Sequence, residues 1–541
     1  MIELETVSDE IKQYITRLET QVNQNIIQCK TYEKKITSLE KKTETLEKTN
    51  TILEKKNHLL EEKLKLALFR QFGRSTERYT APGQQLLFES EEAAAPVKEE
   101  PADETTIPSH SRKKRGRKPL DEKLPRVETV IDIDEAEKRC ACGHELVCIG
   151  EEVSERLQII PQQVWVERIR KPKYACHHCE GSGDEEKPAV RMAKTPGNII
   201  PGSIASPSLL SFIFTNKYVD HLPFYRQEAG FQRIGASISR QNMSNWQRQV
   251  CKKLKPLLEK MKEHLKTGRV LQMDETTMQV LNEPERKNTQ QSYMWLARGG
   301  PPDTPVIWYE YRESRSIKHI MPFLEGFSGY LQSDGYSGYD TALKGHPEIT
   351  HVSCLAHARR RFFEASKANE KPALADAALS QIKGLYVIEE KLRKALREKE
   401  ISEEQFVTQR CEACIPILDA FHDWLEKYVV MVLDTSKLGD AISYTLGQWS
   451  KLVNYLLDVE LTPDNNACER AIRPFVIGRN NWVMSGSPEG AQSSCELFTL
   501  IETAKAHKWN PYEYLKTIFE RAAQMKPSDD WGQLLPWNLL K

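Results

Sequence analysis

The chain has 541 residues, a length that exceeds what one hydrophobic core can organise and therefore predicts several domains. Charged residues make up 28% of it and cancel to a net charge of zero, so only local clusters of charge can indicate a nucleic-acid partner. The sequence has no apolar run of about 18 residues, and its acidic N-terminus lacks an apolar signal segment, so we expect neither a membrane span nor secretion.

A heptad repeat runs through residues 9–68. Apolar residues recur at two positions of a seven-residue cycle, and two asparagines stand at the second position. Leucine at one position with asparagine at the other is typical of a parallel two-stranded coiled coil, because paired amides fix the register. We predict that residues 1–70 form such a coil and make the protein a homodimer or a higher oligomer; the alternative is a single helix that packs on its own chain. The first position holds Ile11, Leu18, Tyr32, Leu39, Leu46, Leu53 and Leu60, and the second holds Ile15, Val22, Ile36, Asn50, Asn57 and Leu64.

Residues 71–126 are predicted to form a linker. Part of it is acidic and rich in Pro and Ala, which is typical of disorder, and a basic run follows. Arg115, Gly116 and Arg117 in that run resemble an AT-hook, in which glycine lets the backbone approach the floor of the minor groove while the arginines enter it. Lys118 stands where the usual proline is expected. We expect Arg115, Arg117 and Lys118 to contact DNA; a basic linker that only binds phosphate or improves solubility is the alternative.

Two cysteine pairs lie within residues 127–190, one spaced Cys-x-Cys and one spaced Cys-x-x-Cys. Two such knuckles around one tetrahedral Zn²⁺ make a zinc ribbon, in which the metal supplies folding energy that a small module lacks. We predict this structural zinc site, with a hairpin formed by residues 159–160 and 164–166 between the pairs. Four unrelated reduced cysteines are the alternative. The predicted ligands are Cys140, Cys142, Cys176 and Cys179, with His144, Cys148, His177 and His178 as possible substitutes.

Residues 200–266 are predicted to be helical. Apolar residues at 209–214 indicate a buried helix, and residues 234–246 are typical of a helix, a short turn and a second helix with Ser239 as its N-cap. This pattern has helix-turn-helix character, which would make the region DNA-binding. A purely structural layer that supports the catalytic domain is equally consistent with it. The polar face of the second helix holds Arg240, Gln241, Asn245 and Arg248.

From residue 267 the periodicity changes to that of strands separated by polar or Gly/Pro turns. The order of three strands, helix, strand, helix, strand and helix is that of a ribonuclease-H-like α/β domain. We assign this domain to residues 267–371 and 458–505, with a helical insertion at 372–457 and a C-terminal segment at 506–541, in a multidomain α+β protein. The expected strands are Val270–Val280, Tyr293–Ala297, Val306–Tyr311, Gly329–Ser333 and Thr350–Ser353; the expected helices include 315–325, 355–367 and one that begins at Thr462 and Pro463.

Three acidic residues stand where a divalent metal could bind. Asp274 lies in the first strand, Asp334 follows the fourth, and Glu469 lies on the helix after the insertion. An acid in a buried strand is costly unless it is paired or bound to a metal. Mg²⁺ prefers carboxylate oxygens, and two such ions can activate an attacking oxygen and stabilise a leaving one.

Each of these assignments has a rival. Glu275 adjoins the first acid but should point to the opposite face of the strand, and Asp340 is the nearest rival of the second. The third, Glu469, could instead form a helical ion pair with Arg473.

Other side chains are expected to support the site. Cys354 and His357 sit on one helical turn, where they would pack or line the wall; alone they make an incomplete zinc site. Trp482 could stack on an unpaired base, although an aromatic after an apolar run is more often part of a core. The arginines expected to contact DNA phosphates are Arg359, Arg360, Arg361, Arg470, Arg473 and Arg479.

Several short motifs occur in a fixed order over most of the chain: Phe72–Glu77, Lys114–Leu120, Pro172–Cys176, Leu222–Gln227, Cys354–Phe362, Asp464–Pro474 and Leu534–Asn538. With these motifs the chain resembles the large transposases of the insertion sequence 66 family, which are DDE-type enzymes. The resemblance implies that Asp274, Asp334 and Glu469 are the catalytic triad and that Mg²⁺ or Mn²⁺ is the cofactor. It also implies terminal inverted repeats and target DNA as substrates, two small accessory proteins of the same element as partners, and a bacterial, cytoplasmic, nucleoid-associated location.

The expected function is therefore DNA transposition in two steps at one site. Water first cleaves the DNA at the ends of the element, and the freed 3′-OH groups then attack target DNA. A catalytically inactive, dimeric, zinc-containing DNA-binding regulator derived from a transposase is one alternative. A metal-dependent nuclease without strand transfer is another.

Overall fold

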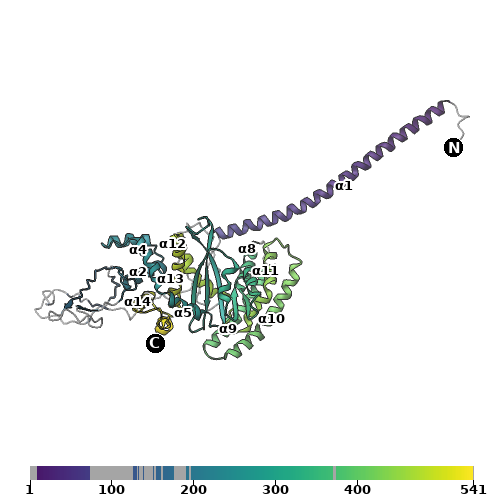
Figure 1. The fold of residues 1–541 in the computed structure, drawn as a ribbon. Coiled ribbons are helices and arrows are strands. Elements are labelled where there is room, and N and C mark those ends of the chain that lie inside the picture. The colour runs from purple at the N-terminus through teal and green to yellow at the C-terminus, as the bar shows by residue number, and fades with distance from the viewer. Residues whose placement is uncertain are drawn as a thin grey trace. The chain divides into compact units, whose positions relative to one another are not determined.

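A computed structural model describes residues 9–72, 197–368 and 373–539, together with short segments between residues 126 and 193. The chain divides into two units, Met1–Ser75 with Val164–Lys541, and Thr76–Gln163. In the first unit, a long N-terminal helix precedes a body in which helices flank a sheet (Figure 1). The predicted linker contacts and zinc ligands lie outside the described residues; these are Arg115, Arg117, Lys118, Cys140, Cys142, Cys176 and Cys179.

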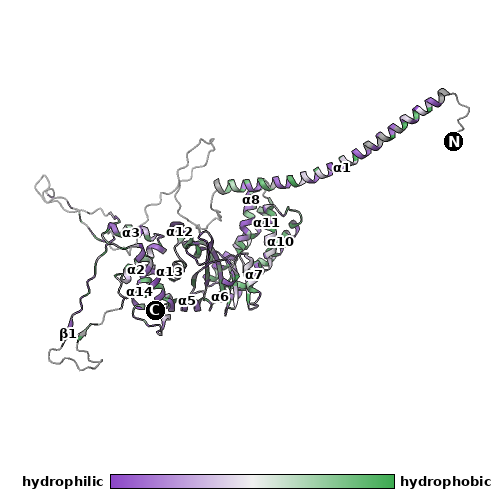
Figure 2. Cartoon of the chain, turned by 45° about the horizontal axis from the view of Figure 1, so that its top comes forward, coloured by the Kyte–Doolittle hydropathy of each residue, from purple (hydrophilic) through white to green (hydrophobic). Residues whose placement is uncertain are grey.

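The heptad segment forms one continuous helix, α1 (Asp9–Phe72). No Pro or Gly occurs in it, so no residue breaks the helical hydrogen bonds. Hydrophilic and hydrophobic stretches alternate along α1 (Figure 2), and its heptad leucines are exposed, Leu46 by 68%. Near its end α1 meets helix α8 (Leu355–Ala368), where Phe69 packs edge-on against Phe363 with ring centroids 6.0 Å apart. The C-terminal end of α1 therefore packs against α8, whereas the heptad leucines further towards its N-terminus are exposed.

The hairpin predicted at residues 159–160 and 164–166 is wrong in its described part, because residues 159 and 164–166 form no strand. A different pair of strands forms, β1 (Lys173–Ala175) antiparallel to β2 (Val190–Met192).

The region before the sheet is helical, as predicted. Ser239 caps α4, and its Oγ accepts the backbone N–H of Asn242 at 3.2 Å. One face of α4 is buried against the body, where Gln247 Nε2 donates to Ser494 Oγ at 3.3 Å. The opposite face, which includes Arg248, is exposed, so one helix combines a structural face with a polar surface. The helices of this region are α2 (Pro207–Tyr218), α3 (Phe224–Arg233), α4 (Arg240–Lys253) and α5 (Lys255–Leu265).

The described residues form a six-stranded sheet in the order β5-β4-β3-β6-β7, and the short β8 pairs with β3. β3, β4 and β5 are antiparallel neighbours, whereas β6 runs parallel to both β3 and β7. β3 is therefore a central strand, and its Leu271 and Met273 are fully buried. All five predicted strands are confirmed. The strands are β3 (Val270–Val280), β4 (Gln291–Gly299), β5 (Val306–Arg312), β6 (Gly329–Ser333), β7 (Ile349–Ser353) and β8 (Met484–Ser485).

The single helix predicted at residues 315–325 is wrong. Two shorter elements replace it, the 3-10 turn η2 (Ile317–His319) and the one-turn helix α6 (Met321–Leu324). Pro322 has no N–H, which disfavours the interior of a helix, and it occupies the first turn of α6. Gly326 then turns the chain towards β6 at a φ of +73° that favours glycine.

Beyond β6 the chain forms α7 (Ser337–Leu343), β7, α8 and then a bundle of α9 (Ala373–Arg397), α10 (Glu403–Val429) and α11 (Lys437–Leu452). The bundle shares its own hydrophobic core with α8. Arg410 of α10 is fully buried and donates to the carbonyls of Leu456, Asp458 and Leu461 at 2.7 to 3.1 Å. These bonds engage both Nη atoms of the buried guanidinium and connect it to η3 (Val453–Leu457) and to the loop that returns the chain to the sheet.

The helix that carries Glu469 is α12 (Asn466–Trp482), which begins later than predicted, with Asn465 at the N-cap position. Thr462 does not cap it, because the Thr462 hydroxyl donates to the carbonyl of Asp464 at 2.6 Å. Pro463 is likewise outside the helix, and its carbonyl accepts the N–H of Leu355 at 2.9 Å. These contacts hold the segment in a non-helical conformation until Asn465.

The C-terminal helices complete the body. Thr499 and Thr503 of α13 accept the backbone N–H groups of Tyr309 and Ile307 at 2.9 and 3.1 Å. Those N–H groups belong to β5 at the edge of the sheet. Because α13 accepts their hydrogen bonds, they are not available to pair with a strand of another chain. The elements are α13 (Pro488–Ala506), α14 (Pro511–Ala522), η4 (Trp531–Leu534) and α15 (Pro536–Leu539).

Candidate active site

Two of the acids come together through the register of two strands. β3 and β6 are parallel, and Gln272 is paired with Gln332. Asp274 and Asp334 each lie two residues further on, so they occur at the same level of the sheet. Asp334 has left the strand, and its Oδ1 accepts the N–H of Tyr336 at 3.0 Å. The pairing of β3 with β6 thus accounts for the proximity of the two carboxylates.

The third acid is brought in by the docking of the start of α12. The buried Asn465 donates from Nδ2 to the carbonyl of Met273 at 3.0 Å, and its backbone N–H points to Cys354 Sγ at 3.2 Å. Gln332 Nε2 donates to the carbonyl of Thr462 at 2.7 Å. Contacts from β3, β6 and α8 therefore fix the first turn of α12, which carries Glu469.

The electrostatics of Asp274 reflect this crowding. Burial raises the pKa of Asp274 to about 7, with further increases from the charges of Glu275, Asp334 and Glu469 and a partial offset from the backbone N–H of Glu275. No ion pair joins Asp274 to a described Lys, Arg or His residue. The oxygens of the three acids do not all lie within 4.8 Å of one another in the described residues, so a bound divalent cation would have to draw them together and would relieve the repulsion among them.

Glu275 is engaged elsewhere, as expected from its position in the strand. Its side chain is 2% exposed, it pairs with Arg315, and it accepts the hydroxyl of Tyr339 at 2.8 Å. Burial raises the pKa of Glu275, and the guanidinium of Arg315 partly offsets the increase. Arg315 also lies 3.5 Å from Asp334 and over the ring of Tyr336. No pattern in the sequence indicated Arg315, which falls in the segment wrongly predicted to be one helix.

Asp340, the rival of Asp334, has a different set of partners. It forms an ion pair with Lys451 at 2.8 Å and contacts His351 Nδ1 at 2.9 Å. These bonds tie α7 to β7 and α11. The structure therefore gives Asp340 a connecting role and leaves Asp334 in the acidic group.

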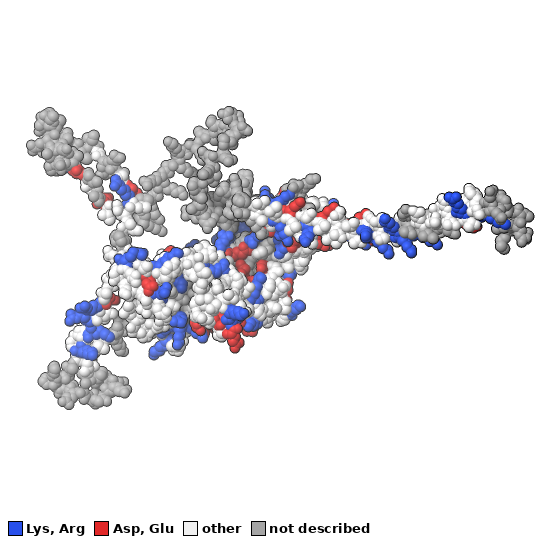
Figure 3. Space-filling model, turned by 90° about the horizontal axis from the view of Figure 1, so that it is seen from above, with Lys and Arg blue, Asp and Glu red and all other residues white. Residues whose placement is uncertain are grey.

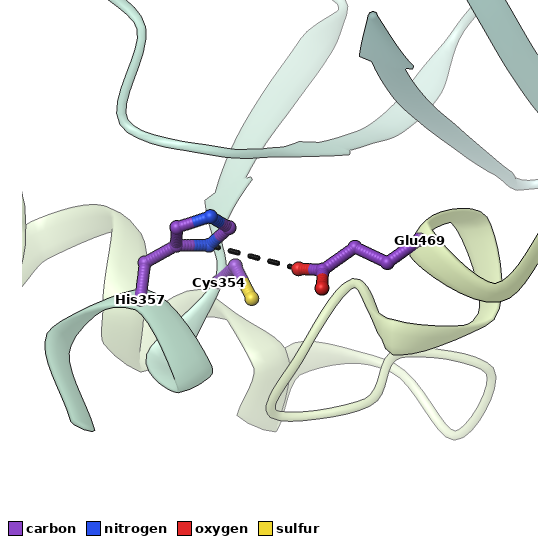
Figure 4. Close-up of side chains that lie close together, drawn as sticks. All are labelled: Cys354, His357 and Glu469. Atoms are coloured by element: carbon purple, nitrogen blue, oxygen red, sulfur yellow. Dashed lines mark ion pairs between the residues drawn. The ribbon is translucent and has the colours of Figure 1, made fainter. Parts of the chain in front are cut away.

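Glu469 also faces two residues of α8. Figure 4 shows the side chains of His357 and Glu469 pointing toward each other, with the thiol of Cys354 beside them. His357 Nδ1 lies 3.8 Å from Glu469 Oε1, and Arg360 Nη2 lies 3.9 Å from Glu469 Oε2. The donor atoms of Cys354, His357 and Glu469 all lie within 4.8 Å of one another. Burial lowers the pKa of His357 and raises that of Cys354 to about 12.

The predicted DNA-contacting arginines differ in exposure. Arg360, Arg470 and Arg473 are exposed, whereas burial lowers the pKa of Arg359, which lies near Tyr386. Acidic and basic side chains are mixed over the face seen in Figure 3. No single basic stripe therefore marks the path of DNA on that face.

Two further predicted contacts are used within the protein. Arg479 Nη1 donates to Thr276 Oγ1 at 3.1 Å and so ties α12 to β3. Trp482 packs against Phe498 and Tyr218, which supports the core interpretation of this side chain.

The stability of the metal-free protein is predicted to fall with pH through Asp274. Its pKa of about 7 in the folded protein exceeds the value of about 4 expected in the unfolded chain. The folded state therefore keeps a proton in this window, and as pH rises through 7 the protein must bury a charge, which destabilises it. In EDTA, Asp274→Asn should be more stable than wild type at pH 8, by up to a few kcal/mol, and closer to it at pH 5.

Urea unfolding at the two pH values measures this difference. Asp303→Asn, a change at an exposed turn, is the matched control and should follow the wild type. Equal pH dependence in wild type and Asp274→Asn would contradict the prediction.

Comparison with known proteins identifies the family. The model "Transposase IS66 family" matches residues 202–493, and the "IS66 C-terminal element" matches residues 499–537. The "zinc-finger binding domain of transposase IS66" matches residues 137–180, and "Transposase C of IS166 homeodomain" matches residues 59–129.

Two relatives from Sinorhizobium fredii (strain NBRC 101917 / NGR234) cover most of the chain. "Uncharacterized protein y4qI" is 32% identical over 435 residues, which are 78% of this chain and 77% of that protein. "Uncharacterized protein y4hP" is 29% identical over 494 residues, 86% of each. Of the helices in the described residues, none has both the length and the apolar character that a membrane crossing requires. The chain belongs to the IS66 family of transposases.

Proposed function

We propose that the protein is a DNA transposase that cleaves at the ends of an insertion sequence and joins the 3′-OH ends to target DNA. The observation that carries this proposal is the placement of Asp274 and Asp334 at the same level of the parallel strands β3 and β6, with Glu469 close enough for its charge to raise the pKa of Asp274. Because the chain belongs to a family of transposases, DNA cleavage and joining is the reaction that we propose for these carboxylates.

We infer a ribonuclease-H-like fold for the catalytic domain. The strand order β5-β4-β3-β6-β7, with the first three strands antiparallel and the next two parallel, supports it. In this arrangement the first acid lies on the central strand and the second follows its parallel neighbour. The helices α9 to α11 then form an insertion between the second acid and Glu469.

The proposed chemistry has two steps at one site. Bound Mg²⁺ or Mn²⁺ ions would activate the attacking oxygen and stabilise the leaving oxygen. Asp274 would lose its proton on binding a cation, and Asp274, Asp334 and Glu469 would then hold the ions. A water oxygen would attack the phosphorus at the element's end and lose one proton to solvent, while the leaving 3′ oxygen takes up a proton and becomes a 3′-OH. That hydroxyl would then attack a phosphodiester of the target and lose its proton, and the bond from phosphorus to the target's own 3′ oxygen breaks as that oxygen takes up a proton.

DNA would approach along the exposed arginines beside Glu469. Arg360, Arg470 and Arg473 are suited to phosphate contacts, because a guanidinium offers several donors to phosphate oxygens. Each such phosphate contact would contribute about one to the slope of the logarithm of the binding constant against the logarithm of the salt concentration. The loss of slope in an arginine variant therefore shows whether that arginine contacts phosphate. Arg115, Arg117 and Lys118 remain expected minor-groove contacts, and the accessory proteins remain an expectation from the resemblance.

The triad is tested by a Mg²⁺-dependent assay on DNA that carries the element's ends. Asp274→Ala, Asp334→Ala and Glu469→Ala should each abolish both cleaved and joined products while DNA binding persists, because each removes a metal ligand. Asp303→Asn is the matched control; it changes an exposed acid outside the acidic group and should retain both products.

The alternative functions give other outcomes in the same assay. Cleavage without joining in the wild type would indicate a nuclease. Binding without either product, with accessory proteins supplied, would indicate an inactive regulator.

We infer that α1 forms a parallel coiled coil with a second copy of this chain. Its heptad leucines expose 43 to 68% of their surface, at Leu18, Leu39, Leu46, Leu53 and Leu60. A continuous apolar stripe of this kind on a 64-residue helix is unfavourable in water without a partner. The asparagines at 50 and 57 favour two strands in register.

Disruption of the stripe should produce monomers. Leu46→Glu with Leu53→Glu places charges in the seam, and the full chain should then sediment at half the mass of the wild type in analytical ultracentrifugation. Thr45→Glu with Thr51→Glu adds the same charge outside the seam and should leave the mass unchanged. A wild type that is monomeric at micromolar concentration would refute the coil.

We also infer a structural zinc site at Cys140, Cys142, Cys176 and Cys179, supported by the zinc-finger match over residues 137–180. Purified protein should contain at least one zinc per chain by elemental analysis. Cys176→Ser should lose it, because a tetrahedral site with three protein ligands binds more weakly. Cys411→Ser, which changes a thiol of α10, should lose none. Less than one zinc per chain in the wild type would remove this inference.

A further inference from the structure

The side chains around Glu469 contain two buried atoms without partners. His357 Nδ1 and Glu469 Oε1 are both inaccessible to water, and neither has a hydrogen-bond partner within the described residues. They point toward each other across 3.8 Å, which is too long for a hydrogen bond (Figure 4). Two unsatisfied polar atoms at the same place are costly unless something lies between them.

A metal ion fits the separation. Ligand atoms held about 2.1 Å from one ion lie roughly 3 to 4 Å apart, the range in which Nδ1 and Oε1 are found. Cys354 Sγ supplies a third donor within 4.8 Å of the other two. Cys354 and His357 occupy one turn at the start of α8, and Glu469 lies in the first turn of α12, so both elements that hold the donors are fixed by the contacts of Asn465.

We propose that Cys354, His357 and Glu469 form a three-donor site for a transition-metal ion of the Zn²⁺ or Co²⁺ type, distinct in chemistry from the carboxylate set. This inference deepens the proposed function and rests on it only in that Glu469 is shared. Thiolate and imidazole select Zn²⁺ and its neighbours over Mg²⁺, which prefers oxygen ligands. Three protein ligands leave a fourth tetrahedral position open.

Sharing Glu469 has a functional consequence. An ion held by Cys354, His357 and Glu469 uses Oε1, the carboxylate oxygen that faces α8. Glu469 would then be withdrawn from the neighbouring acids or would bridge the two sites. In the first case, a transition ion opposes Mg²⁺-dependent strand cleavage; in the second, it joins the catalytic ions.

Cobalt binding tests the site without reference to activity. Full-length protein that carries one Zn²⁺ per chain, the amount that the predicted four-cysteine site takes up, is titrated with Co²⁺, and the absorbance of the thiolate–cobalt charge transfer is recorded. The wild type should take up one further Co²⁺ per chain with this absorbance. Cys354→Ser should lose the absorbance, since serine can still accept the N–H of Asn465 but gives no thiolate. His357→Ala should weaken binding roughly tenfold or more, as expected for loss of a ligand.

The matched control is His422→Ala. His422 belongs to a second group of potential ligands, with Asp423 and Glu426, that lies partly exposed on α10 and contains no thiol. The absorbance should be unchanged in this variant. Asp274→Asn should also keep the cobalt signal while losing strand cleavage, so the new site and the proposed function can fail separately.

The proposal requires that the wild type and the two ligand variants differ in cobalt binding. Equal absorbance and affinity in wild type, Cys354→Ser and His357→Ala would overturn it. If a variant fails to fold, the wild type alone decides, because no uptake of further Co²⁺, or uptake without thiolate absorbance, contradicts a site that contains Cys354.

Discussion

A hydrogen bond from the buried Asn465 to the carbonyl of Met273 joins the start of α12 to the strand that carries Asp274. The rest of the site depends on this contact, because Glu469 lies only one turn further along α12. The backbone N–H of Asn465 reaches Cys354 as well, so the same residue links β3, α8 and α12. A glutamate on a helix that was not docked in this way would have no fixed distance to the two aspartates.

The bundle of α9, α10 and α11 makes that docking possible. It separates Asp334 from Glu469 in the sequence, and it returns the chain to the sheet through a loop held by the buried Arg410. Lys451 and Asn454 connect the end of the bundle to Asp340 and to the carbonyl of His351. The end of the bundle is therefore attached to the sheet just before the loop that leads to α12.

The charges of the site are arranged in two groups. Glu275 is neutralised by Arg315 and Tyr339 on one side of the strand, and Asp274 lies among acids without a described cationic partner on the other. Asp334 lies between the groups, 3.5 Å from Arg315. Burial raises the pKa of Asp274, and the charges of the neighbouring acids raise it further. A cation bound beside Asp274, as proposed above, would offset this repulsion.

The sequence by itself determined the elements whose signals are local. The period of the apolar residues gave the five strands, the absence of Pro and Gly gave α1, and Ser239 gave the cap of α4. It also singled out Asp274 and Asp334, because an acid in or directly after a buried strand is unusual whatever surrounds it, whereas Glu469 was indicated mainly by the family resemblance. The one helix predicted at residues 315–325 was wrong, and Pro322 lies in the first turn of the short helix found there.

Only the tertiary structure decided which distant side chains meet. The start of α12 was mispredicted because Thr462 and Pro463 are held by β6 and α8, and a local capping rule cannot register such contacts. Arg315 pairs with Glu275, and Glu469 completes the group begun by Cys354 and His357, for the same reason. Local patterns specify how a segment folds, whereas partners contributed by other elements depend on strand register and helix docking, which arise only when the whole chain packs.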